Sequence, residues 1–331
     1  MKVVIPLAGF GKRLRPHTYS KPKPLLNVAG KAVLGHVLDK LQGLDVEEIV
    51  FIVGYLGEQI EEYVSARYGF PARYVEQKEL LGQAHAIRLA REYVQGDVLI
   101  LFVDTIFEAD LTPLSNLTSD GVIYCKEVDD PRRFGVVTLG QGGFITRFVE
   151  KPAEPISNLA VIGLYYLKDA PALFSAIDEL IGRDIQTKGE YFLADALQLL
   201  VDKGKLLNSS TVEVWEDCGT PEAVLHTNRY LLEHGQGNAE GVQSLNSVII
   251  RPVHIASSAL VANSVIGPYV TIGENAEVRN AIVRDSIIDA GATIEDTMLD
   301  QSLVGKEALV RGRFRRFNVG DSSAVDFSPV L

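Results

Sequence analysis

Short apolar segments alternate with amphipathic segments over residues 1–235. Runs rich in Val, Ile and Leu predict strands, and segments whose apolar residues recur every three or four positions predict helices. The predicted strands lie at 2–7, 47–54, 72–77, 97–104, 120–126, 134–139, 143–150 and 159–167. The predicted helices lie at 31–44, 57–69, 82–94, 170–182, 190–204 and 220–235. Such alternation is typical of a parallel or mixed sheet covered on both faces, so we expect an α/β domain.

A different pattern begins after the polar segment at 235–241. Similar groups of four residues recur at spacings of 17, 17 and 16 residues, beginning at Asn246, Asn263, Asn280 and Asp296. Between them aliphatic residues fall at six-residue steps, as at Ile266, Ile272 and Val278. Steps of six, six and five residues close one triangular coil of a parallel β-helix, whereas a flat antiparallel sheet would show a period of two. We therefore expect two domains, 1–235 and 236–331.

The composition narrows the class of protein. Of the 331 residues, 47% are hydrophobic and 23% are charged, as in globular proteins, and the formal net charge of -11 argues against a general nucleic-acid binder. Two cysteines are too few for a disulfide framework and suit a reducing cytoplasm. No apolar run approaches the roughly 18 residues of a membrane helix, and the first residues do not resemble a signal peptide. We expect a cytoplasmic protein that binds neither membrane nor nucleic acid.

The first residues carry charge of the opposite sign. Residues 1–31 contain seven Lys or Arg and no acid, and the first acid is Asp39. The strand at 2–7 leads into the glycine-rich segment GFGKRLRP, whose backbone N–H groups could approach phosphate oxygens closely. The same glycines would also suit an ordinary tight turn in a solvated basic loop. Cations clustered without acids repel one another unless an anion binds, so the pattern favours a small, strongly anionic ligand.

Two acids follow predicted or possible strands. Asp104 ends the apolar strand at 97–104, where ligands bind in open α/β sheets, and Asp217 lies in the segment VEVWEDCGTPE. One or two carboxylates with phosphate oxygens suit Mg²⁺, but each acid could instead be a turn or helix-cap residue. Lys151 after the strand at 143–150 could be merely solvated. Glu190, in the segment KGE at 188–190, is expected to open a helix.

The order of several motifs shows a resemblance to a known family. AGFGKRLRPHT, KPKPLL, VEQKELLGQAHAI, VDTIFEADL, FGVV, FVEKP, SNLAVIGLYYL, KGEYFLADAL and WEDCGTPE occur in this sequence along the chain. Together they resemble the sugar-phosphate nucleotidyltransferases, in the long forms of glucose-1-phosphate thymidylyltransferases and uridylyltransferases. The resemblance covers essentially the whole chain. It implies a Rossmann-like mixed sheet with helices on both faces, followed by a C-terminal left-handed parallel β-helix.

The resemblance also implies a reaction and its residues. A nucleoside triphosphate and a sugar-1-phosphate would give an NDP-sugar and pyrophosphate, with Mg²⁺ held by Asp104 and Asp217. The implied catalytic cations are Arg13, Lys23 and Lys151. The residues implied to bind the nucleotide are Leu7, Gly9, Gly11, Gln77 and Gly82. Those implied to bind the sugar phosphate are Gly135, Glu150, Lys151, Lys188 and Glu190.

Some positions depart from the common pattern of the family. Lys12 stands where Thr is common, Thr105 where Asn is common, and the glycine loop has the shorter length of the uridylyltransferases. The choice between dTTP and UTP therefore stays open, with glucose-1-phosphate as the default sugar. Two other functions remain: an inactive regulatory subunit that binds nucleotide or sugar, and a bifunctional enzyme whose β-helix transfers acyl groups. We expect the β-helix to support a homo-oligomer.

Overall fold

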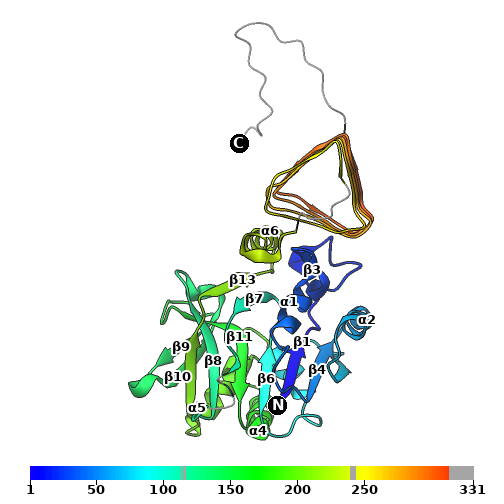
Figure 1. Cartoon of the computed structure of the whole chain (residues 1–331). Coiled ribbons are helices and arrows are strands. Elements are labelled where there is room, and N and C mark those ends of the chain that lie inside the picture. The colour runs from blue at the N-terminus through cyan, green and yellow to red at the C-terminus, as the bar shows by residue number, and fades with distance from the viewer. Residues whose placement is uncertain (113, 115–116, 239–243, 313–331) are drawn as a thin grey trace. The chain divides into compact units, whose positions relative to one another are not determined.

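The computed structural model describes residues 1–112, 114, 117–238 and 244–312, and the chain forms two compact units, Met1–Leu231 and Leu232–Leu331. In the first unit a sheet of nine described strands contains β1 (Lys2–Pro6), β4 (Glu48–Val53), β5 (Ala72–Glu76), β6 (Val98–Leu101), β8 (Gly121–Glu127), β9 (Gly135–Leu139), β10 (Ile145–Glu150), β11 (Leu159–Leu167) and β12 (Leu207–Thr211). The main path runs β10-β9-β11-β6-β1-β4-β5, and β8 pairs with β11 and β12 (Figure 1). Parallel pairs around β1 and antiparallel pairs around β11 make the sheet mixed, as predicted.

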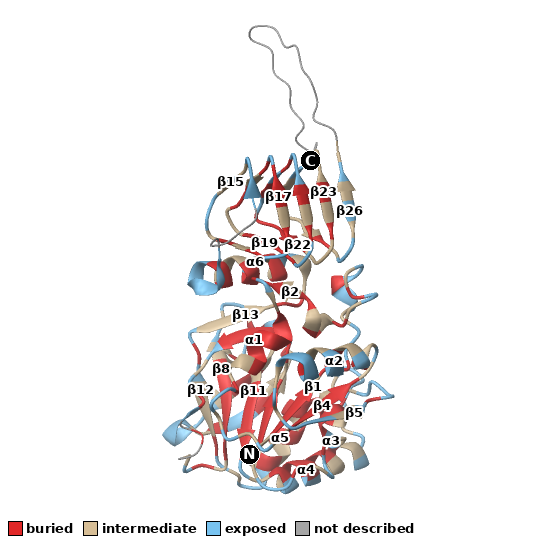
Figure 2. Cartoon of the chain, turned by 45° about the vertical axis from the view of Figure 1, so that its right-hand side comes forward, coloured by how far each residue is buried: buried red, intermediate tan, exposed pale blue. Residues whose placement is uncertain are grey.

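Helices cover both faces of this sheet. They are α1 (Val33–Asp39), α2 (Gly57–Arg67), α3 (Gln83–Arg88), α4 (Ala170–Gly182) and α5 (Leu193–Asp202), whereas α6 (Pro221–Leu231) packs against two short strands outside this sheet, Asn27–Val28 and Val214–Asp217. Val4 and Ile100 belong to one apolar cluster with residues of α3, α4 and α5, while their neighbours Val3 and Leu99, which point to the opposite face, are equally buried. Figure 2 shows buried residues along the central strands and on the inner sides of α1 and α4. The strands are therefore apolar on both faces, which explains their continuous hydrophobic runs.

Several predicted helices are shorter than their apolar pattern. The segment 31–44 gives α1 only over Val33–Asp39, because Lys31–Ala32 forms β3 in a hairpin with β2 (Asn27–Val28). Beyond Asp39 the backbone tightens into hydrogen bonds between residues three apart, such as Gln42 N–H to Asp39 O at 3.2 Å.

The sequence pattern also did not predict the two-stranded sheet of β7 (Thr105–Glu108) and β13 (Val214–Asp217). Its strands contain four residues each, too few for a clear period.

The second unit is the parallel β-helix that the repeat predicts, in the left-handed form that the resemblance implies. Its first sheet contains β14 (Ser244–Leu245), β17 (Leu260–Ala262), β20 (Glu277–Arg279), β23 (Thr293–Glu295) and β26 (Leu309–Arg311). The second contains β15 (Val248–Ile249), β18 (Val265–Ile266), β21 (Ile282–Arg284) and β24 (Met298–Asp300). The third contains β16 (Val253–Ile255), β19 (Val270–Ile272), β22 (Ile287–Ile288) and β25 (Leu303–Val304). Seen along its axis in Figure 1, the unit is a stack of triangular coils.

Two sets of residues that stack from coil to coil explain the repeat: aliphatic residues in the interior and Asn residues at a corner. The six-residue steps fill the interior, since Ile266, Ile272 and Val278 are fully buried. The repeated Asn residues occupy a corner in the left-handed backbone conformation, with φ of 46° at Asn246, 50° at Asn263 and 49° at Asn280. Asn tolerates this conformation better than most residues. Their side chains also bond to one another between coils, as from Asn263 Nδ2 to Asn280 Oδ1 at 3.3 Å.

Ile272→Ala is expected to destabilise the β-helix strongly. Ile272 is fully buried in the axis, and truncating such a side chain costs about 2–5 kcal/mol. Ile282→Ala is the matched control, because that side chain points outward and is 37% exposed. We expect it to cost less than about 1 kcal/mol. Thermal unfolding of both variants checks this expectation, and equal losses of stability would contradict the assigned direction of the two side chains.

Candidate active site

The glycine-rich loop follows the strand at which the order of the sheet changes direction. β1 pairs in parallel with β4 on one side and with β6 on the other, so the strand order of the sheet runs in opposite directions from β1. This change of direction leaves room for a ligand at the strand ends. The loop from Leu7 to Leu26 occupies this place and contains the short helical turns η1 (Lys12–Leu14) and η2 (Lys23–Leu25).

Gly11 brings the two ends of this loop together. Its φ is +59°, and a Cβ added there would lie 3.0 Å from Cβ of Lys23 and 3.1 Å from Cγ2 of Thr18. The Thr18 hydroxyl donates to the carbonyl oxygen of Gly11 at 2.9 Å. A side chain at Gly11 would strain the backbone and separate these neighbours. The turn thereby holds Gly11 against Lys23, and Arg13 and Lys23 line the same cavity although ten positions separate them in the sequence.

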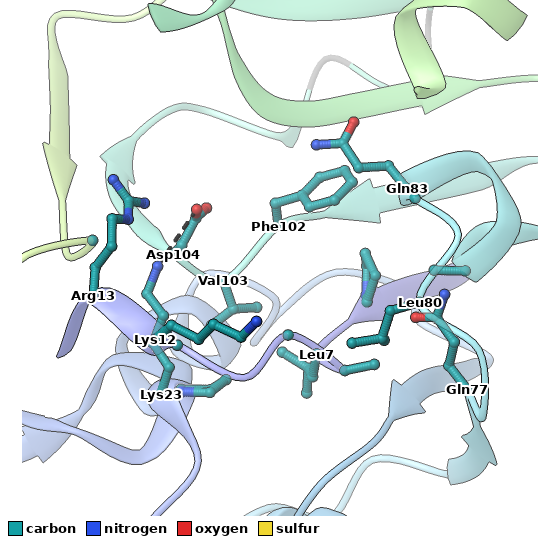
Figure 3. A pocket seen from close by; sticks show the side chains of 18 of the residues that line it. Leu7, Lys12, Arg13, Lys23, Gln77, Leu80, Gln83, Phe102, Val103 and Asp104 are labelled. Atoms are coloured by element: carbon teal, nitrogen blue, oxygen red, sulfur yellow. Dashed lines mark ion pairs between the residues drawn. The ribbon is translucent and has the colours of Figure 1, made fainter. Parts of the chain in front are cut away.

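A first cavity of about 450 Å³ opens beside the loop (Figure 3). The predicted site residues that line it are Leu7, Gly9, Gly11, Arg13, Lys23, Gln77, Gly82, Asp104 and Glu190. Figure 3 shows the cationic side chains at one end and Gln77 with Leu80 at the other. Its volume falls within the range of small-molecule sites, and the separation of charged and amide ends suits a ligand with a phosphate group and a neutral ring.

The amide end of the first cavity is held in place by backbone contacts. Gln77 follows β5, its N–H donates to Val53 O at 2.8 Å, and its side chain lies 3.3 Å from His85 Nδ1. Gly82 has φ +116°, and a Cβ there would lie 2.6 Å from the carbonyl oxygen of Tyr191. Only glycine fits this approach, so Gly82 and the start of α3 pack directly against the chain at Tyr191.

The two predicted metal ligands are neighbours in space. β13 pairs antiparallel with β7 so that Asp217 lies opposite Thr105, and Cys218 N–H donates to Asp104 O at 2.8 Å. Asp104 Oδ2 lies 3.5 Å from Lys23 Nζ, the dashed contact in Figure 3. The Asp217 carboxylate accepts a hydrogen bond from Gly219 N–H at 2.7 Å. Asp217 is therefore also a turn residue, which was the alternative interpretation of its sequence position. Both carboxylates still line one cavity, described next.

A second cavity of about 330 Å³ adjoins the first. Four residues line both cavities and form the wall between them: Arg13, Gln83, Phe102 and Asp104. The predicted residues Gly135, Glu150, Lys151 and Asp217 line only the second cavity. Two molecules bound in these cavities would meet at the Arg13 guanidinium and the Asp104 carboxylate.

Glu150 and Lys151 are placed by β10 and the backbone that follows it. Lys151 has φ 44°, an unusual value for a residue with a side chain, and its N–H donates to Phe134 O at 3.0 Å. Its ammonium lies 4.8 Å from the centre of the Phe192 ring and 3.4 Å from Glu150 Oε1. Burial raises the pKa of Glu150, against the opposing effect of Lys151. A Cβ on Gly135 would lie 2.8 Å from Glu150 Oε2, so glycine leaves space for this carboxylate.

Lys188 lies outside the residues that line the two cavities, although its charge still acts on Glu150. The expectation that Glu190 opens a helix is wrong, since α5 begins at Leu193. Thr187 and Glu190 instead exchange two backbone bonds across Lys188 and Gly189, whose φ values are 52° and 82°. Positive φ at both central residues defines a tight hairpin turn of type I′, which the sequence alone did not reveal.

Several lining residues were not predicted from the sequence. Phe102 and Gln83 separate the two cavities, while Trp215 and Arg133 line the second one. The indole Nε1 of Trp215 is buried without a hydrogen-bond partner in the described structure. Trp215 immediately precedes Glu216 and Asp217, so its position beside a predicted ligand was the available signal. Arg133 had no such signal, because the fold of β9 and β13 brings it to the cavity.

A divalent metal fits this donor set. Asp104 and Asp217 supply hard carboxylate oxygens at one cavity wall, and Lys23 already neutralises part of the negative charge of Asp104. Among the described residues, no group of three or more His, Cys, Asp or Glu side chains is arranged to hold a metal alone. Mg²⁺ commonly takes one or two protein carboxylates and completes its shell with water and phosphate oxygens. The pair therefore suits a metal that arrives with a phosphorylated ligand.

Family models match both parts of the chain. The model described as nucleotidyl transferase matches residues 2–234, and the model described as GlmU-like, C-terminal hexapeptide matches residues 237–301. No helix in the described part of the chain is long and apolar enough to cross a membrane.

Two relatives are similar to nearly the whole chain. The low-salt glycan biosynthesis nucleotidyltransferase Agl11 of Haloferax volcanii is 32% identical, with 99% of this chain and 96% of that protein covered. A glucose-1-phosphate thymidylyltransferase of Streptomyces griseus is 28% identical over 99% of this chain and 100% of its own length. The solved structure of a nucleoside-diphosphate-sugar pyrophosphorylase from Vibrio cholerae has a TM-score of 0.61 and 22% identity, covers 69% of this chain and 99% of its own, and shows a common fold.

These findings confirm the resemblance seen in the sequence motifs, and they agree with a fold that joins a mixed α/β sheet to a β-helix. The chain is an enzyme of the nucleotidyl transferase family, among the sugar-phosphate nucleotidyltransferases that carry C-terminal hexapeptide repeats.

Proposed function

We propose that the protein joins a nucleoside triphosphate, dTTP or UTP, to a sugar-1-phosphate and releases pyrophosphate. Glucose-1-phosphate is the default sugar. The observation that carries the proposal is the pair of adjoining cavities whose common wall contains Arg13 and Asp104. A single-substrate enzyme needs one such cavity, whereas a transfer between two phosphorylated molecules needs two that meet at a cationic group.

The nucleotide belongs in the first cavity. Its base would lie at the end formed by Gln77 and Gly82, with Leu7 beneath it, and its phosphates at Gly9 and Gly11. Arg13 and Lys23 would neutralise the phosphates from that end. Gln77 offers both a donor and an acceptor to a base edge, which fits recognition of a pyrimidine.

The sugar-1-phosphate belongs in the second cavity. Lys151 would bind its phosphate, and the buried carboxylate of Glu150 would accept hydrogen bonds from sugar hydroxyls beside Gly135. Lys188 would act on the phosphate only at longer range, since it does not line the cavity. Glu190 lines the first cavity, so we assign it to the junction with the nucleotide sugar rather than to the sugar alone.

The reaction is a displacement at phosphorus that needs no covalent intermediate on the protein. A phosphate oxygen of the sugar-1-phosphate attacks the α-phosphorus, a new P–O bond forms, and the bond to the leaving pyrophosphate breaks. Arg13 faces both cavities and can stabilise the charge that develops between them. Holding two anions in line is the main task of the chain, because repulsion and lost freedom dominate the barrier.

Mg²⁺, held by Asp104 and Asp217, would supply neutralisation of phosphate charge when bound. The residues of the chain then have separate tasks. Lys23 holds Asp104 in position and adds positive charge beside it, with Nζ 3.5 Å from Oδ2. The turn at Asp217 fixes its carboxylate through the Gly219 N–H.

Glu150→Gln is expected to weaken binding of the sugar-1-phosphate and to change how stability depends on pH. Glutamine keeps the size but loses the charged acceptor, so we expect the KM for the sugar-1-phosphate to rise by roughly ten- to a hundredfold. Because burial raises the pKa of Glu150 above its ordinary 4.5, the folded chain holds the proton more tightly than the unfolded chain. Stability of the unaltered chain should therefore fall as pH rises from its ordinary pKa through the raised one.

The Glu150→Gln variant has no carboxyl group at this position, so its stability should not fall in this way as pH rises. The difference in melting temperature between Glu150→Gln and the unaltered chain should shift in favour of the variant as pH rises from 4 toward 8. A difference independent of pH would contradict the assigned cost of the buried carboxylate.

The test of the function is a panel of dTTP, UTP, ATP and GTP against several sugar-1-phosphates, with pyrophosphate release as the readout. The proposal predicts release that requires both substrates and is fastest with a pyrimidine nucleotide. Absence of release from every pair would favour the inactive regulatory subunit. The presence of Arg13, Lys23, Asp104 and Lys151 around the two cavities favours catalysis.

The bifunctional alternative concerns the β-helix. Its described residues contain one histidine in a coil, His254, which lies in β16 opposite Thr271. Burial lowers the pKa of His254, and its ring is bonded to the backbone of Gln236, so it is already engaged structurally. We therefore favour an assembly role for the β-helix within a homo-oligomer. A radiolabelled acyl-CoA assay on the full chain would detect acyl transfer.

A further inference from the structure

We propose that Lys12 is a binding residue for the leaving pyrophosphate, a role beyond those of Arg13 and Lys23. The inference rests on the proposed function and deepens it. Lys12 lines the first cavity and not the second, and Figure 3 shows its side chain extending from the loop toward Leu7. In the sequence Lys12 belongs to the acid-free cationic segment, but the resemblance implied no role for it, since Thr is common at this position in the family.

The geometry of displacement places the pyrophosphate near Lys12. The sugar phosphate attacks from the second cavity, and the leaving group departs on the opposite side of the α-phosphorus. Arg13 and Asp104 line both cavities and so mark the point of reaction. The pyrophosphate must then lie on the wall that belongs to the first cavity alone, which contains Gly9, Gly11, Lys12 and Lys23.

Lys12 is the cation of that wall whose charge remains available. Lys23 lies 3.5 Å from the Asp104 carboxylate, so part of its charge is already neutralised. Lys12 has no carboxylate within ion-pair distance among the residues that the structure describes, and its ammonium lies 5.9 Å from the centre of the Phe10 ring. An exposed contact of this kind contributes little, on the order of 0.5–1 kcal/mol, and leaves the ammonium free to donate to an anion.

The backbone at Lys12 is also fixed before any ligand binds. Gly11 packs against Thr18 and Lys23 at the distances given above, and η1 begins at Lys12 itself. Only the flexible side chain must be ordered on binding. A lysine acts on phosphate as a point charge, which suits a leaving group that departs after each turnover.

Pyrophosphate affinity is the measurement that isolates this role. The NDP-sugar product carries its two phosphates at the point of reaction and into the second cavity, and it has no group at the pyrophosphate wall. Lys12→Thr should therefore weaken the binding of magnesium pyrophosphate by roughly ten- to thirtyfold and leave the binding of the NDP-sugar within about twofold of the unaltered enzyme. Lys12→Arg should restore most of the pyrophosphate affinity, since the charge returns.

Arg15→Thr is the matched control from the same loop. Arg15 stacks over Tyr19 at 4.8 Å from the ring centre and lines neither cavity, so its loss should change neither affinity. Calorimetric titration with pyrophosphate, and with UDP-glucose and dTDP-glucose in turn, measures both. An unchanged pyrophosphate affinity in Lys12→Thr, or an equal loss for the NDP-sugar, would overturn the proposal. Failure of the unaltered enzyme to release pyrophosphate in the substrate panel would instead overturn the proposed function.

Discussion

Lys23→Ala is expected to lower kcat by more than about a hundredfold with the fold intact. The Lys23 side chain is only 14% exposed and lies at the cationic end of the first cavity, with its ammonium beside Asp104. Alanine retains the Cβ that packs against Gly11, so the loop backbone keeps its contacts. The loss should therefore reflect missing charge at the phosphates. Steady-state kinetics with both substrates saturating would measure it.

Lys40→Ala is the control for removing a lysine from this unit. Lys40 forms an ion pair with Glu108 and lines neither cavity. The turnover of the Lys40→Ala variant should therefore stay close to that of the unaltered enzyme. Near-normal turnover in Lys23→Ala would exclude the role assigned to Lys23. A folded circular-dichroism spectrum in both variants establishes that the comparison concerns activity.

Asp104→Asn is expected to lower activity and to weaken its dependence on Mg²⁺ together. An amide can still accept one hydrogen bond but carries no charge, so it is a poor ligand for a hard divalent cation. We expect the Mg²⁺ concentration for half-maximal activity to rise by about tenfold or more. The variant also leaves Lys23 without its partner carboxylate, which should preserve or increase attraction for the triphosphate.

Asp110→Asn is the matched control for this change. Asp110 is an exposed acid that bonds to Thr112 in a loop and lines neither cavity. Its Mg²⁺ titration should be unchanged. If the titration of Asp104→Asn is also unchanged, the carboxylate pair does not hold the metal.

The fold could be predicted from the sequence where one regular period dominated. The coils of the β-helix follow from the 17-residue spacing, because each corner Asn must return after one full coil. The central strands follow from continuous apolar runs such as the one that ends before Asp104. Short elements such as β7 and β13 could not be predicted, since their pairing brings together segments more than a hundred residues apart.

Members of the candidate site could be proposed from the sequence where several charges lie close together along the chain. Arg13, Lys23 and the glycines between the strand and η1 form one continuous segment. Phe102, Gln83, Trp215 and Arg133 could not be grouped in this way, because only the tertiary arrangement places them around one cavity. The wrong helical start at Glu190 has a local cause: the Lys188-Gly189 turn satisfies the backbone of Thr187 and Glu190 before α5 begins.

The central claim is that two adjoining cavities hold the nucleotide and the sugar phosphate on either side of Arg13 and Asp104. A crystal structure of the enzyme with its NDP-sugar product and Mg²⁺ tests it most directly. The account predicts the base against Gln77 and Gly82, the diphosphate at Arg13, and the sugar against Glu150 beside Lys151. A product bound elsewhere on the chain, or with its sugar in the first cavity and its base in the second, would contradict it.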